Sequence, residues 1–414
     1  MSPFDELLST TPCALKEYVI LPKLGGEKVI FEGEFTLKEG EKDYIVHGRV
    51  YYSFCEKIEL LFEGETIESV HVDAFEQSFE ISVGDSINGN ALVTQIQGKV
   101  LKGFVLRFET KIPTSCQCWR WCYLNGPQIF GHAVRRDSWK CSDRLVFRDG
   151  DYQVIIENKC FYKQQKEHRE ISHFCELRRR DGQSIFKNDA LDEILLFSRF
   201  VSFFAGCQHA PFFIEGLDED NVIYSCHCLG NDRSLVSVSS WKPAFKDQDL
   251  IALWPLFRAK RYESQDQYDV LNTVIHWYIE ANMNSGLLEG AFLLGFTGIE
   301  LISKELVGKE LRNREIIEDF ISRLHLDAQM NPEDLSTMRN YLVHYKSPKR
   351  RFAYTSLSYE DKNSRIEMLL QMLELAILYW LGYEGHYCDR RKALWRGEVI
   401  KIVPWHEPVE SLKA

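Results

Sequence analysis

The side chains with the clearest capacity for chemistry are Arg339 and His344, five positions apart in the segment 331–351. Histidine has an unperturbed pKa of about 6.5, so it can take up or release a proton near neutral pH. Arginine keeps its proton and is therefore suited to holding a phosphate and stabilising the negative charge that develops on it. Asn340, four residues before His344, would neighbour it on a helix and could orient the imidazole or a phosphate oxygen. These residue types predict acid–base chemistry on a phosphate ester that requires no metal.

A helix over Asn331–Lys346 is predicted to position these side chains. Asparagine accepts hydrogen bonds from free backbone amides, and Pro332 after it is tolerated at the first helical position. Pro348 marks the stop, because proline disfavours a helical conformation in the residue before it. At 3.6 residues per turn, Arg339 lies about 140° around the helix from His344. The apolar stripe that should face the core contains Leu335, Met338, Leu342 and Tyr345.

A basic run follows the histidine and is the candidate RNA-binding patch: Lys346, Lys349, Arg350 and Arg351. The whole chain has a net charge of −11, which opposes non-specific binding to a polyanion, so an RNA would have to use a local patch. Three cations near the chain end could extend it: Arg390, Arg391 and Lys392. The alternative interpretation of both runs is solvated surface without a ligand.

The pattern Arg339-Asn340-x-x-x-His344 at a helix end resembles the R-N-x-x-x-H motif of HEPN domains. The order and lengths of the surrounding helices, over residues 250–400, are most similar to the ApeA-type HEPN family of bacterial anti-phage proteins. The resemblance implies an all-α bundle that is a metal-independent endoribonuclease, without a cofactor, and works as a homodimer. It also makes Glu300 the best match for an acidic or polar residue on the helix before the motif. The alternative for Glu300 is an ion-paired glutamate at the rim of the bundle.

The implied reaction uses the nucleophile that RNA carries itself, the 2′-hydroxyl beside each phosphate. One histidine per chain cannot be both acid and base, and a symmetric dimer would bring two histidines and two arginines into one cleft. The expected partners are therefore RNA, with tRNA among the candidates, and a second copy of the chain. By the same resemblance, the protein would be a toxin of abortive infection.

Two other function classes compete with the ribonuclease. The first is a non-catalytic HEPN-type binding or scaffold module in a defence or toxin–antitoxin complex. The second, a deoxyribonuclease, is disfavoured because the chain has no carboxylate cluster suited to Mg²⁺.

The front part of the chain, residues 1–245, is predicted to be a β-rich, sandwich- or barrel-like domain, because short segments alternate between apolar and polar residues. By analogy with the family it would sense a phage-derived trigger or restrain the nuclease. A Trp/Cys-rich passage at residues 116–127 is expected to interrupt the strands, and residues 190–207 to form a helix. The expected strands cover residues 29–37, 44–52, 57–62, 76–83, 91–97, 100–110, 143–147, 152–157, 170–180, 211–217 and 221–228.

The second part, residues 246–414, is predicted to be a helical bundle, which makes the fold class α+β. Residues 241–262 are expected to be a connection with some helical content, which Pro243 and Pro255 break. Three glycines of the second helix should mark close contacts between helices: Gly290, Gly295 and Gly298. The expected helices cover residues 268–283, 288–307, 314–326, 331–346 and 361–381.

The length of 414 residues is enough for two or three domains. No apolar run reaches the roughly 18 residues of a membrane span, and no secretory signal is apparent, so the expected location is the cytoplasm. The 12 cysteines are then expected to be reduced. Two clusters allow a composite zinc site, although buried cysteines in strands are the simpler interpretation. The clusters are Cys116, Cys118 and Cys122, and Cys226, His227 and Cys228.

Overall fold

In the computed structural model the chain forms two compact units. The first contains Met1–Ser198 and His209–Leu235, and the second contains Arg199–Gln208 and Val236–Ala414. Helix α2 (Lys187–Ala205) begins in the first unit and ends in the second. The structure describes residues 11–19, 26–54, 58–67, 77–111, 115–136, 139–159, 170–228, 238–243, 246–283, 287–326, 331–344, 346–391 and 400–406.

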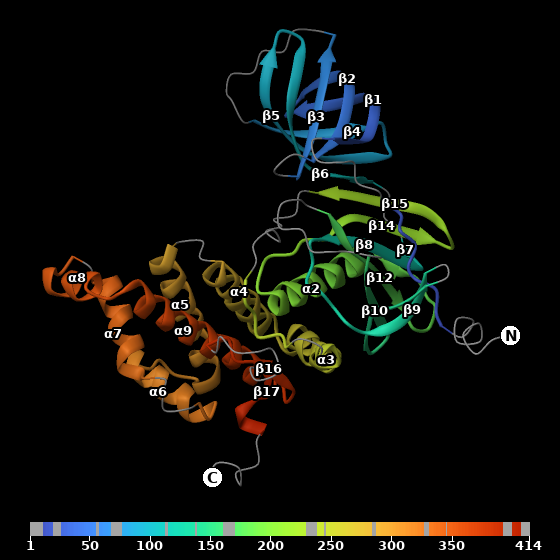
Figure 1. Cartoon of the computed structure of the whole chain (residues 1–414). Helices are drawn as coiled ribbons and strands as arrows, with labels where there is room; N and C mark the ends of the chain where they lie inside the picture. The colour runs from blue at the N-terminus through green and yellow to red at the C-terminus, as the bar shows by residue number, and fades with distance from the viewer. Residues whose placement is uncertain are drawn as a thin grey trace. The chain divides into compact units, whose positions relative to one another are not determined.

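Six strands at the start of the first unit close into a barrel. They are β1 (Glu27–Glu39), β2 (Lys42–Phe54), β3 (Ile58–Thr66), β4 (Gln77–Val83), β5 (Ile87–Gln97) and β6 (Val100–Thr110). Their order is β3-β2-β1-β4-β5-β6, and β3 also pairs with β6, so the ring is complete (Figure 1). Alternate residues point inward, as the predicted alternation requires, and bury Phe35, Val46, Leu60, Phe62 and Ile81. Of the two predicted architectures, a sandwich and a barrel, these six strands form a barrel.

The sheet continues beyond β6 into a second group of antiparallel strands, in the order β15-β14-β8-β12-β11-β10-β9. Their bounds are β8 (Cys118–Leu124), β9 (His132–Arg136), β10 (Trp139–Asp149), β11 (Tyr152–Asn158), β12 (Ile171–Arg179), β14 (Phe212–Asp218) and β15 (Asn221–Cys228). A two-stranded pair, β7 (Ser115–Cys116) and β13 (Ile185–Phe186), accompanies them.

The expectation that the Trp/Cys-rich passage interrupts the strands is wrong, because β8 lies between β14 and β12 in the middle of this group. Trp121 contacts the ring of Phe197 on α2, at 6.1 Å between centroids, whereas Cys122 belongs to the core that also contains the barrel residues. A strand buried on both faces is apolar throughout, so it lacks the alternation on which the prediction relied.

The second unit consists mainly of helices, so the fold class is α+β, as predicted. They are α3 (Asp247–Glu263), α4 (Gln265–Asn282), α5 (Leu287–Val307), α6 (Asn313–Arg323), α7 (Pro332–Val343), α8 (Pro348–Thr355) and α9 (Tyr359–Trp380). A short pair, β16 (His386–Cys388) and β17 (Ile400–Ile402), and a 3-10 turn (Pro404–His406) follow. None of the helices described is both long and apolar enough to cross a membrane.

Two of the three glycines in α5 mark close helix contacts, as predicted. A Cβ atom on Gly295 would lie 3.2 Å from Leu369, and one on Gly298 would lie 3.1 Å from Leu373, both on α9. The prediction is wrong for Gly290, where a Cβ atom would meet none of the described residues within 4 Å.

The predictions based on proline were wrong at two places. Residues 247–263 form one helix, α3, although Pro255 lies inside it, because buried Trp254 and Phe257 hold its inner face. Pro348, predicted only as a stop, is also the first residue of the unpredicted helix α8. The helix α7 ends at Val343 and not at Lys346, so the basic run lies partly on α8.

Candidate active site

The helix α7 begins as the sequence predicted. The side chain of Asn331 accepts a hydrogen bond from the backbone N–H of Glu333 at 3.0 Å, and Pro332 is the first helical residue. Leu335 and Met338 are fully buried, which confirms the predicted core face at these positions. The other two stripe residues differ, since Leu342 is half-buried and Tyr345 lies outside the described residues.

Arg339 and Glu300 are in contact across two helices. The Arg339 Nη2 donates to Glu300 Oε1 at 3.3 Å, from α7 to α5, and the two side chains are 26% and 31% exposed. Asn313, the first residue of α6, completes the cluster when its amide nitrogen is turned toward Glu300. Its nitrogen then donates to Glu300 Oε1 at 3.2 Å, and its oxygen accepts from Arg339 Nε at 3.2 Å. The sequence offered no signal for Asn313, because the contact joins residues far apart in the chain.

His344 is the residue that caps the C-terminal end of α7. Its backbone N–H donates to the Asn340 carbonyl at 3.1 Å, and its side chain is exposed. Among the described residues no hydrogen bond joins the side chains of Asn340 and His344. A role of Asn340 in orienting the imidazole or a phosphate oxygen stays a prediction. His344 is exposed, and it follows Arg339 by five residues, about 140° around the helix.

The two groups of cations that were predicted to bind RNA, the basic run and the residues near the chain end, differ in their exposure to solvent. Lys346, Lys349 and Arg351 are exposed, and the two lysines have no ion-pair partner among the residues that the structure describes. The side chain of Arg350 lies outside those residues. In contrast, Arg390 is buried, which excludes it from an RNA-binding surface. Arg391 pairs with Asp389, and Lys392 is not described.

Arg390 belongs to a buried polar cluster of the helical unit. It contacts Glu374 at 2.9 Å and the side-chain oxygen of Asn282 at 2.6 Å, and its side chain is 2% exposed. Tyr278 donates to the same Glu374 carboxylate at 2.6 Å. Burial raises the pKa of Glu374 to about 7, although the Arg390 charge lowers it. The cluster ties the segment around β16 to α4 and α9 and is structural.

The cysteines lie in strands, as the simpler interpretation predicted. Cys116, Cys118 and Cys122 are buried, as is Cys226. Burial raises the pKa of the Cys118 thiol to about 12, as expected for a cysteine packed inside the sheet. In the parts of the chain that the structure describes, no group of three or more His, Cys, Asp or Glu residues could hold a metal ion.

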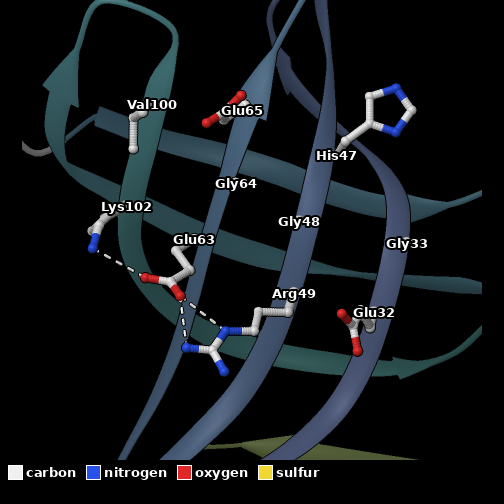
Figure 2. Close-up of a pocket in the computed structure, with 10 residues that line it drawn as sticks. All are labelled: Glu32, Gly33, His47, Gly48, Arg49, Glu63, Gly64, Glu65, Val100 and Lys102. Carbon is white, nitrogen blue, oxygen red and sulfur yellow. Dashed lines mark hydrogen bonds and ion pairs between the residues drawn. The ribbon is translucent and has the colours of Figure 1, made fainter.

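A hollow of about 520 Å³ lies on the barrel, over β1, β2, β3 and β6 (Figure 2). Gly33, Gly48 and Gly64 are paired in register across its floor. A Cβ atom on Gly48 would lie 2.1 Å from the carbonyl oxygen of Glu63, so the glycines allow the close strand approach of the barrel. Arg49 and Lys102 both pair with Glu63, at 2.7 and 3.0 Å. The lining carries three glutamates, Glu32, Glu63 and Glu65, against the two cations Arg49 and Lys102, so its net negative charge opposes a polyanion.

Two segments of the chain match known protein families. Residues 120–227 match the family described as YopA central domain, and residues 313–401 match the YopA C-terminal domain. The second match includes Asn313, Arg339 and His344, whereas Glu300 precedes it. No solved structure matches the chain significantly. The chain is also 24% identical, over 91% of its length and 94% of the relative's, to the SPbeta prophage-derived uncharacterized protein YopA of Bacillus subtilis (strain 168).

Proposed function

We propose that this protein is a metal-independent endoribonuclease with an ApeA-like HEPN bundle, acting in the cytoplasm in abortive infection. The observation that carries the proposal is the geometry of α7. Arg339 is held at its edge by Glu300, and His344 caps its exposed end. A fixed cation and a free imidazole on one short helix are the groups that cleavage of RNA without a metal requires.

The proposed reaction assigns one step to each group. The 2′-oxygen attacks the adjacent phosphorus while the bond from phosphorus to the 5′-oxygen breaks. One His344 takes the proton of the 2′-hydroxyl, and His344 of the partner subunit gives a proton to the departing 5′-oxygen. The products are a 2′,3′-cyclic phosphate and a 5′-hydroxyl end.

Arg339 stabilises the negative charge on the phosphate oxygens during this reaction. Arginine carries more N–H donors than its contacts with Glu300 and Asn313 use. The guanidinium can therefore keep these two residues on one edge and bind a phosphate on the other. In this proposal Glu300 and Asn313 are positioning residues, and Lys346, Lys349, Arg350 and Arg351 bind the RNA backbone.

The proposed setting rests on two further arguments. The resemblance to the ApeA-type family supports an anti-phage role in which the β-rich unit senses a phage product. The relative in Bacillus subtilis is a prophage-derived protein, which supports a role in the interaction between phages and bacteria.

The test is cleavage of total cellular RNA in EDTA by the purified protein, beside His344→Ala and Arg339→Ala. We expect fragments with 2′,3′-cyclic ends from the wild type only, and losses of about 10² to 10⁴-fold in the variants. Circular dichroism should show that both variants fold, because both side chains lie off the core face.

The scaffold hypothesis makes the opposite prediction. The Arg339–Glu300 ion pair favours the scaffold hypothesis, since the guanidinium is already paired with a carboxylate. If His344→Ala and Arg339→Ala keep full toxicity in cells, or if wild-type cleavage requires Mg²⁺, the proposed mechanism is wrong.

A further inference from the structure

Helix α8, which follows α7 in the chain and lies beside it (Figure 1), has an inner and an outer face with different chemistry. Tyr354 is 3% exposed, donates to the Glu289 carboxylate on α5, and has the Lys362 ammonium 4.2 Å from its ring centre. Phe352 is 74% exposed. Phe352 and Tyr354 are two positions apart, so their side chains lie about 200° apart around the helix. Tyr354 therefore anchors α8 to the bundle, whereas Phe352 points to solvent.

A cation lies beside this exposed ring. Lys349 is three residues before Phe352 and therefore lies beside it on the same face of α8. Lys349 and Lys346 are exposed, and neither has an ion-pair partner in the described part of the chain. The chain as a whole carries a net charge of −11. The positive charge of Lys349 beside the exposed ring of Phe352 therefore differs in sign from the protein as a whole.

Helix α8 begins close to His344. The backbone N–H of Ser347, the residue before α8, donates to the His344 carbonyl at 3.0 Å. The eight residues of α8 extend about 12 Å from Ser347. An RNA strand lying along α8 would therefore reach the end of α7, where His344 lies.

We propose that the outer face of α8 is a binding surface for single-stranded RNA, in which a base stacks on Phe352 and phosphates contact Lys346 and Lys349. This inference rests on the proposed ribonuclease function and names the form of its substrate. Aromatic rings between lysines suit single strands, because only an unpaired base offers a free face for stacking. Every base can stack on an aromatic ring, so this surface should distinguish a single strand from a duplex but not one base sequence from another.

The test measures RNA binding by the full chain carrying His344→Ala, which should prevent cleavage during the measurement. The probes are a fluorescent single strand and the same strand in a duplex. We expect the single strand to bind more tightly, and Phe352→Ala to weaken its binding about tenfold or more. Phe352→Trp should keep the affinity, since it keeps an aromatic face. Lys349→Gln should lower the salt dependence by about one unit of slope.

Phe186, an exposed phenylalanine in β13, provides the matched control. Phe186→Ala should leave the affinity unchanged. Equal affinity for duplex and single strand, an unchanged affinity in Phe352→Ala, or no RNA binding at all would overturn the inference. So would sedimentation showing that Phe352→Ala separates a dimer, because a second copy would then cover this face.

The two proposals can fail separately. If binding depends on Phe352 while the wild type cleaves no RNA, the binding surface stands and the nuclease does not. If the wild type cleaves RNA while Phe352→Ala binds it normally, the nuclease stands and the binding surface does not.

Discussion

Two arginine–glutamate pairs of the helical unit use the same groups but differ in their exposure to solvent. The Arg390 and Glu374 side chains are 2% and 0% exposed, whereas those of Arg339 and Glu300 are 26% and 31% exposed. Each pair also contacts an asparagine, Asn282 in the buried cluster and Asn313 in the exposed one. Exposure, and not residue type, therefore separates an arginine that stabilises the fold from one that can receive a ligand.

The difference follows from the cost of desolvation. A buried ion pair gives up its hydration, and this loss is offset only when every charged group finds a partner. Arg390 meets that condition with Glu374, Glu367 and Asn282, so it has little capacity left for a ligand. An exposed pair gains little from its own contact and exchanges partners at small cost.

The largest expected effect is the loss of stability when the buried arginine is removed. Arg390→Ala leaves Glu374 buried without its cation, which should lower the free energy of unfolding by about 3–5 kcal/mol. Arg339→Ala, the matched change in the exposed pair, should lower it by less than about 1 kcal/mol. Urea unfolding of both variants measures the difference. Equal losses would show that burial does not distinguish the two pairs.

The contrast also explains how much of this site could be predicted from the sequence. The start of α7 was predictable because Asn331 and Pro332 are local signals, and so was the place of Arg339 and His344 on it. Asn313 and the burial of Arg390 were not, because they depend on contacts between distant residues that follow no periodic pattern.

The same limit applies to the fold. The barrel strands alternate because one face of each is buried, and the sequence predicted them closely. The strand β8 has two buried faces, so it does not alternate. Helix α8 was missed because Pro348 is compatible with both the end of one helix and the start of the next.

The next largest expected effect is a dependence of the free energy of unfolding on pH, which arises from Glu374 in the buried cluster. The folded-state pKa of Glu374 is about 7, above its ordinary value of 4.5. The folded protein therefore binds more protons than the unfolded one between these values, and this group's contribution to stability falls as pH rises from about 4.5 to about 7. The loss is at most about 3 kcal/mol.

Glu374→Gln isolates this contribution, because glutamine does not titrate and is similar in shape. Unfolding in urea between pH 4.5 and pH 8 should show that the stability of the wild type relative to Glu374→Gln decreases as pH rises. A relative stability that stays constant, or increases, would mean that Glu374 is ionised throughout this range.

The smallest expected effect comes from the two asparagines. Asn282 donates to the carbonyls of Gly206 and Ser239, both at 2.8 Å, and accepts from Arg390, so Asn282→Ala should lower the free energy of unfolding by about 1–3 kcal/mol. Asn313→Ala removes only half-exposed contacts and should cost less than about 0.5 kcal/mol. If Asn313 positions Arg339, the variant should still cleave RNA several-fold more slowly at saturating substrate. Cleavage at the wild-type rate would leave Glu300 as the one residue of this cluster that positions the arginine.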